Sequence, residues 1–232
     1  MDINFIELES DVIKKELKLV NRHKGAGSDG VHPYIISSCA EELVEPITHI
    51  FRLSMTSGIF PDYWKKGLIT PIPKNTKNNL ITEYRPISKL SVFGKILEKL
   101  VTQTLYQSVK HHISENQHGF MKFRSVDTNM LTFSDYLLRA MDNGFQIDVV
   151  YTDFSKAFDK INHDLLISKL LEVGVHGSLL RWIDSYVRNR SQAVCIKGYC
   201  LGFLIVPSGI PQGSHLGPLL FSLYINDMGP IF

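Results

Sequence analysis

Ile147-Asp148-Val149-Val150-Tyr151-Thr152-Asp153 is a mostly apolar run that ends in an acidic residue. Its branched and aromatic residues are typical of a strand in a buried sheet. A helix is predicted further along, from Asp164 to Val173, and Gly174 ends it. The strand therefore places the carboxylate of Asp153 at the end of a buried element.

Asp153 has two interpretations. A carboxylate at a buried strand end costs free energy unless it caps a turn, has a partner or binds a metal. Mg²⁺ prefers carboxylate oxygens on a rigid element, and polymerases hold two such ions with strand-end carboxylates. Taken alone, Asp153 is better explained as a cap of the turn after the strand. Asp159 and Asn162 suit the cap of the next helix, and Phe158 either belongs to the core or stacks against a sugar.

The second chemical signal is Gly209-Ile210-Pro211-Gln212-Gly213-Ser214-His215-Leu216-Gly217-Pro218. Glycine and proline fix an unusual turn before a helix, so exposed backbone N–H groups and the Gln212 amide are available to a base pair or sugar. A serine-hydrolase elbow is excluded because Gln212 and Leu216 stand where that motif needs glycine. The glycine-rich segment 24–30 is not a P-loop, since no Gly-Lys-Ser/Thr follows it.

Apolar periodicity predicts the other elements. The expected helices run from a Ser10 cap to near Gly25, over 43–58, over 93–105, from Asp127 to Met141, over 179–186 and over 219–224. The expected strands are an edge strand over Gly67–Lys74 and a hairpin of 192–196 with 201–206 around Lys197-Gly198. Strands and helices mix without regular alternation, which favours an α+β fold over a doubly wound sheet.

Composition and charge narrow the class of protein. The chain has 232 residues, 44% of them hydrophobic, which is enough for a substantial core. No apolar run is long enough to span a membrane and no signal core is present, so an intracellular protein without a membrane partner is expected. Residues 60–125 hold eleven Lys/Arg against four Asp/Glu. This basic segment is either a solvated helix face or a surface for nucleic acid.

The cysteines and histidines carry weaker signals. Cys39, Cys195 and Cys200 leave one thiol over from any disulfide framework, so all three are predicted to be reduced. His111, His112 and His118 have no recognised metal-ligand spacing.

Several segments, in this order, resemble the reverse transcriptase domain of LINE-type (jockey-like) non-LTR retrotransposons. The resemblance rests on residues 24–30, Phe60-Pro61-Asp62-Tyr63-Trp64-Lys65 with Pro71-Ile72-Pro73-Lys74, Tyr84-Arg85-Pro86-Ile87-Ser88 with Lys95-Ile96-Leu97-Glu98-Lys99, Gln117-His118-Gly119-Phe120 with Arg124-Ser125, Asp153-Phe154-Ser155-Lys156-Ala157-Phe158-Asp159 with His163, and residues 209–221 continuing to Tyr224-Ile225-Asn226-Asp227. It covers nearly the whole chain.

The resemblance implies a right-hand polymerase, with a helical N-terminal extension over 1–60, fingers over 61–145 and a partial palm over 146–232. It implies an RNA template, a DNA primer and dNTPs as substrates, and Mg²⁺ as cofactor. The implied roles are a catalytic metal ligand for Asp153 with the Phe154 carbonyl, a sugar gate for Phe158, triphosphate binding for Lys74 and Arg85, and contact with the template–nucleotide pair for Gln212 and Gly213.

The sequence also departs from the family's pattern. The aromatic-Ala-Asp-Asp box that follows these motifs in the family does not occur before Phe232, and Met121 stands where the family usually has a basic residue. A two-metal site needs more than one carboxylate. The chain is therefore expected to be a C-terminally truncated fragment that is inactive alone. The alternative is a remnant that binds nucleic acid without catalysis.

Overall fold

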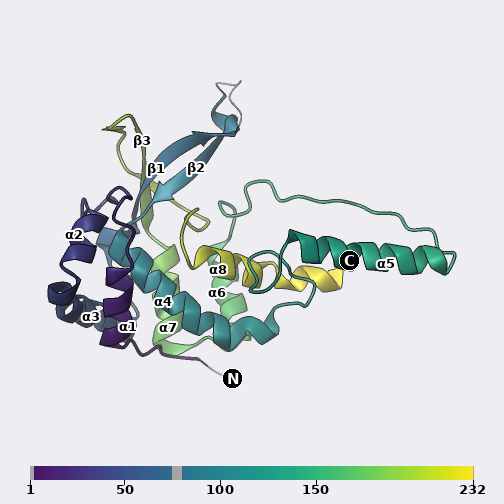
Figure 1. The fold of residues 1–232 in the computed structure, drawn as a ribbon, viewed down its shortest axis with the longest axis horizontal. Helices are drawn as coiled ribbons and strands as arrows, with labels where there is room; N and C mark the ends of the chain where they lie inside the picture. Colours follow the sequence, from purple (N-terminus) through teal and green to yellow (C-terminus); the bar gives the residue numbers. More distant parts are fainter. Residues whose placement is uncertain (1–2, 75–79, 232) are drawn as a thin grey trace.

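The computed structural model describes residues 3–74 and 80–231 (Figure 1). Helices and a mixed sheet combine in an α+β arrangement, as predicted. The helices are α1 (Ser10–Lys18), α2 (Pro33–Ser38), α3 (Ala40–Ser57), α4 (Val92–Val109), α5 (Val126–Asp142), α6 (His163–Glu172), α7 (Gly177–Val187) and α8 (Gly217–Tyr224), with short 3₁₀ turns η1 (Asp62–Lys65), η2 (Ile81–Glu83), η3 (Lys110–His112) and η4 (Asn226–Ile231). The strands are β1 (Lys66–Pro73), β2 (Tyr84–Lys89), β3 (Arg190–Ile196), β4 (Tyr199–Cys200) and β5 (Leu204–Val206).

Apolar periodicity located most helices correctly. Helices α3 to α8 lie where the sequence predicts them, and α3 ends at Gly58 in the left-handed conformation with φ 72°. The prediction for α1 was wrong at both ends, because Glu9 is the N-cap and the helix ends at Lys18 rather than near Gly25. Helix α2 was not predicted, since its six residues are too few to show an apolar period.

The sheet has the order β2-β1-β3-β4, and β5 also pairs with β3. Strand β1 is antiparallel to β2 and parallel to β3, so the prediction of an edge strand was wrong. The parallel pairing covers only Lys66 to Ile69 of β1. Pro71 and Pro73 lie beyond it, where β1 pairs with β2 alone. The prolines therefore mark an exposed half of an otherwise interior strand.

The predicted hairpin around Lys197-Gly198 is confirmed. Strand β3 pairs with β4 and β5, and both turn residues have positive φ, 49° and 87°. Cys195 and Cys200 are directly opposite each other in this hairpin and form a disulfide, whereas Cys39 is free. The prediction that all three cysteines are reduced was thus wrong for this pair, because the strand register brings the two together.

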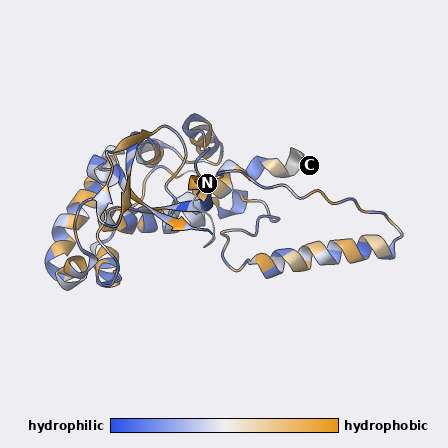
Figure 2. Cartoon of the chain, turned by 90° about the horizontal axis from the view of Figure 1, so that it is seen from above, coloured by the Kyte–Doolittle hydropathy of each residue, from blue (hydrophilic) through white to orange (hydrophobic). Residues whose placement is uncertain are grey.

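The predicted strand over 147–153 was also wrong. Residues 145–154 have no regular secondary structure and run as an extended segment from α5 back to the body (Figure 1). Val150 is 84% and Tyr151 83% exposed. A strand needs a neighbour to satisfy its backbone, and in the described part of the chain none pairs with this segment. Helix α5 has no buried residue and stands apart from the body in both views (Figures 1 and 2).

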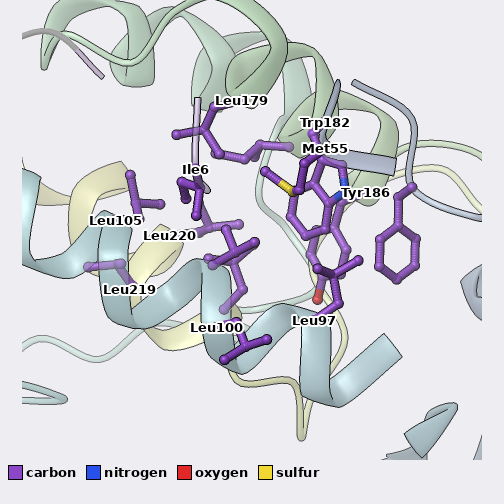
Figure 3. Packing of buried hydrophobic residues seen from close by; sticks show 14 of the residues in the cluster. Ile6, Met55, Leu97, Leu100, Leu105, Leu179, Trp182, Tyr186, Leu219 and Leu220 are labelled. Carbon is purple, nitrogen blue, oxygen red and sulfur yellow. The ribbon is translucent and has the colours of Figure 1, made fainter. Parts of the chain in front are cut away.

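The core joins the N-terminal helices to α4, α7 and α8 (Figure 3). At its centre the Phe60 ring meets the rings of Trp182 and Tyr186 edge-on, with centroids 5.4 and 5.1 Å apart. The indole N–H of Trp182 donates to the Ser54 hydroxyl at 2.9 Å, which satisfies a buried donor. This packing holds α7 against α3 and the segment that follows it. Among the described residues, no helix is both long and apolar enough to cross a membrane.

Candidate functional site

Two loops that are far apart in sequence lie against each other. They are the Asp153 loop, residues 153–161, and the Gln212 loop, residues 207–213. The backbone N–H groups of Gly209 and Ile210 donate to the carbonyls of Ile161 and Phe158, each at 2.9 Å. The Gln212 side-chain amide donates to the Asp159 carboxylate at 3.5 Å. The two sequence motifs, around Asp153 and around Gln212, are therefore joined by backbone hydrogen bonds. We call this contact the junction.

Gly209 allows this close approach. Its φ is +84°, and a Cβ atom built on it would stand 2.5 Å from the Phe158 carbonyl oxygen. Its own carbonyl lies 2.8 Å from Nε2 of His163, a buried side chain on α6. The junction is thus fixed by a residue without a side chain and by an imidazole beneath it.

Aromatic rings join the Asp153 loop to α8. Phe158 stacks on Phe221 with centroids 5.2 Å apart, and Phe154 meets the same ring edge-on at 5.9 Å. Phe120 meets Phe158 edge-on at 6.1 Å. Through these contacts Phe158 packs against the core, and its side chain is half-buried.

The Gln212 loop is also attached to strand β2. The Ser88 N–H donates to the Gln212 carbonyl at 3.1 Å. Gly213 follows with φ +101°, and a Cβ there would come within 3.4 Å of the Ser88 carbonyl oxygen. Strand β2 belongs to the basic segment 60–125, so this loop links that segment to the Asp153 loop.

A cavity of about 330 Å³ opens where the two loops meet the sheet. Lys65, Lys156, Asp159, Arg190 and Gln212 are among its lining residues. Lys65 and Arg190 are buried, and Lys65 forms an ion pair with Asp62 at 2.8 Å. The cavity wall therefore carries three cations, with Asp159 as its acidic group among the described lining residues.

The other predicted site residues lie elsewhere. Lys74 and Arg85 stand at the outer part of the β1–β2 hairpin, where Ile72 pairs with Arg85 and the Lys74 N–H donates to Glu83 at 2.7 Å. The Asp153 carboxylate is exposed at the end of the extended segment. None of these three is among the described residues that line the cavity. Of the predicted site residues, Gln212 is the one found among the described lining residues of the cavity. Phe154 and Phe158 are brought together on the Phe221 ring, and Gly213 lies against Ser88.

Glu98 on α4 is a residue that the sequence did not single out. It is 1% exposed, and its carboxylate accepts a hydrogen bond from the His215 N–H at 2.9 Å. Burial raises the pKa of Glu98, whereas the charge of Arg190 and the His215 N–H oppose that rise. Its position between two lysines in Lys95-Ile96-Leu97-Glu98-Lys99 resembles an exposed helix face, so only the tertiary structure reveals its burial.

The metal prediction finds no complete site. Within residues 3–74 and 80–231, no group of three or more His, Cys, Asp or Glu side chains is arranged to hold a metal ion. Asp153 and the Phe154 carbonyl alone do not make the ligand set that two magnesium ions require.

Comparisons with known proteins bear on the same residues. The family model described as reverse transcriptase (RNA-dependent DNA polymerase) matches residues 72–230. The chain is 28% identical to a probable RNA-directed DNA polymerase from transposon BS of Drosophila melanogaster, over 98% of this chain and 25% of that protein. It is 28% identical to the RNA-directed DNA polymerase from mobile element jockey of the same species, over 96% of this chain and 24% of that protein. The chain thus spans about a quarter of the length of these relatives.

Proposed function

Because the chain belongs to the reverse transcriptase (RNA-dependent DNA polymerase) family, we propose that it supplies the template- and nucleotide-binding part of a retrotransposon's RNA-directed DNA polymerase. Membership confirms the resemblance that the ordered motifs indicate. The observation that carries the proposal is the junction of the Asp153 and Gln212 loops beside a cavity walled by cations. In this proposal residues 61–145 are fingers and 146–232 part of a palm, with the helical segment 1–60 packed behind them.

Gln212 and Gly213 are proposed to contact the template–nucleotide pair. The Gln212 carbonyl is already engaged by Ser88, so its backbone is fixed relative to β2. The side-chain amide reaches Asp159 at only 3.5 Å, a weak contact that a base or sugar can replace. Gly213 is exposed, which leaves its backbone open to a close approach by a nucleotide.

Lys74 and Arg85 are proposed to hold the triphosphate of the incoming dNTP. They lie in the same hairpin, whose inner half forms the cavity wall at Gly67 and Ser88. A guanidinium binds phosphate oxygens through two N–H groups at once. Arg85 is exposed, so its guanidinium is accessible to a phosphate group.

Asp153 and the Phe154 carbonyl are proposed as ligands for a divalent metal ion, with Mg²⁺ as the expected one. The Phe154 and Phe158 rings anchor the Asp153 loop to α8, which limits where the Asp153 carboxylate can lie. The site needs further carboxylates beside it, and no catalytic step is assigned to the described residues alone. Phe158, held by Phe120 and Phe221, is proposed to limit space at the sugar 2′ position.

RNA binding by the 232-residue chain tests the proposal. With about four phosphates contacted, affinity for a single-stranded RNA should fall about 50-fold between about 50 and about 200 mM salt, because bound counterions are released. Lys156→Gln, at the cavity, should weaken binding and reduce the salt slope by about 0.7. Fluorescence anisotropy titrations measure both quantities.

Lys15→Gln is the matched control, since Lys15 is an exposed lysine on α1. It should leave the affinity and the slope unchanged. Salt-independent binding, or equal effects of the two substitutions, would contradict the assignment of the cavity to nucleic acid. Binding without nucleotide incorporation is also what a non-catalytic nucleic-acid-binding remnant would show, so this experiment tests the surface and primer extension tests the chemistry.

A further inference from the structure

A buried polar cluster adjoins the cavity, which its member Arg190 lines. Glu98 of α4, Tyr186 of α7 and Arg190 of β3 belong to it, and all three are at most 4% exposed. The guanidinium of Arg190 lies over the Tyr186 ring, 5.0 Å from its centroid, and Nη1 donates to the Tyr186 carbonyl at 3.0 Å. Three separate elements therefore place polar groups in one region of the core.

The cluster contains polar atoms that ordinary core packing does not explain. Among the described residues, neither the Tyr186 hydroxyl nor Nη2 of Arg190 has a hydrogen-bond partner of normal geometry. Unpaired buried groups are costly, and each needs a compensating interaction. The carboxyl group of Glu98 lies near both, since it interacts with the Arg190 charge and with the Tyr186 hydroxyl.

Glu98 also contacts the backbone immediately after the Gln212 loop. Its carboxylate accepts the His215 N–H just before α8 begins, and the Ser214 hydroxyl accepts the Gly217 N–H at 3.0 Å. A negative group at the start of a helix stabilises it through the helix dipole. Arg190, whose positive charge acts on this carboxylate as that of Lys95 does, lines the cavity together with Gln212. The Glu98 carboxylate therefore interacts both with Arg190, in the cavity wall, and with the backbone that follows Gln212.

We propose that Glu98 is a positioning residue, whose buried carboxylate fixes the Gln212–His215 turn against Arg190 so that the turn is presented to nucleic acid in one conformation. Glu98 does not itself touch the substrate. The role in nucleic-acid binding rests on the proposed function. The contact between Glu98 and the turn does not depend on that function.

Hydrogen exchange on the 232-residue chain tests the turn directly. Glu98→Leu removes the acceptor and should speed exchange of the backbone amides over 212–217 about tenfold or more, since the His215 N–H loses its hydrogen-bond partner. Glu98→Gln keeps an acceptor for the His215 N–H and should restore much of that protection. Exchange in α7 and β1 should stay as in the wild type in the Gln variant.

Glu42→Gln is the matched control, because Glu42 is an exposed glutamate on α3. It should leave exchange in the turn unchanged. In a parallel RNA titration, Glu98→Leu should weaken binding several-fold and Glu98→Gln much less, and neither should change the salt slope, since the number of phosphate contacts is the same. A loss of stability alone would instead speed exchange throughout the chain.

The outcomes separate the two proposals. Unchanged exchange over 212–217 in both Glu98 variants, or an equal increase in every element, would overturn the role of Glu98. If the Leu variant does not fold, the Gln variant decides: its amide is a weaker acceptor than a carboxylate, so exchange over 212–217 should be faster than in the wild type, and wild-type exchange there would overturn the role. If the exchange pattern is as expected and the wild-type chain binds no RNA at low salt, the proposed function fails and the role of Glu98 in the turn stands.

Discussion

Replacing Asp153 with asparagine is expected to reduce primer extension at least about 100-fold, because the amide cannot supply a negatively charged ligand for a metal that stabilises charge in phosphoryl transfer. The assay uses this chain extended by the segment that follows in one of its Drosophila relatives, with an RNA template, a DNA primer, dNTPs and Mg²⁺. The Asp153 side chain is exposed, so the substitution removes no buried group. Thermal stability and RNA affinity should therefore remain unchanged while incorporation is lost.

Asp148→Asn is the control for this prediction. Asp148 lies in the same extended segment, is also exposed, and accepts only a 3.3 Å hydrogen bond from Gln146. The control should extend primers as well as the parent does. Equal activity of the Asp153→Asn variant and the parent would show that this carboxylate has no part in the chemistry.

The second large effect is expected at Gly209. Gly209→Ala should lower the free energy of unfolding by about 3 kcal/mol or more, because it combines an unfavourable positive φ with a Cβ pressed into backbone. The obstructing atoms are the carbonyl oxygen of Phe158 at 2.5 Å and the Cα of Asp159 at 2.7 Å, neither of which can move without opening the junction. Urea denaturation followed by tryptophan fluorescence measures the change.

Gly198→Ala is the control that separates the cost of a positive φ from the cost of a steric clash. Gly198 has nearly the same φ, +87°, but an added Cβ meets nothing within 4 Å. It should cost about 1 kcal/mol, the conformational term alone. If the two substitutions cost the same, the close contact between the Asp153 and Gln212 loops does not exist in solution.

The sequence predicted correctly those elements whose structure depends on residues close together in the chain. Helices α4 and α7 carry continuous apolar stripes, and the glycines at 58 and 174 end helices where the sequence places their ends. The turn at Lys197-Gly198 also followed from its residue types. The resemblance implied that Asp153 and Gln212 serve one polymerase site. The structure joins their two loops by backbone hydrogen bonds but leaves the Asp153 carboxylate outside the cavity.

Pairing across the chain was not predictable in the same way. The apolar run 147–153 indicates a strand, but a strand forms only where another offers its backbone, and that information lies outside the run. Strand β1 was taken for an edge because of its prolines, although four of its residues pair with β3. Glu98 has the sequence surroundings of a solvated residue, and its burial depends on α7 and α8. These errors share one cause, since each concerns a distant partner.

Photo-crosslinking of an RNA–DNA template–primer to the 232-residue chain, followed by mass spectrometric mapping, tests the central claim most directly. If nucleic acid binds where the Asp153 and Gln212 loops meet, we expect crosslinked peptides from 156–160 and 207–214, the two segments that line the cavity there. Crosslinks confined to α1–α3, with none in either loop at a salt concentration where the chain binds the duplex, would contradict it.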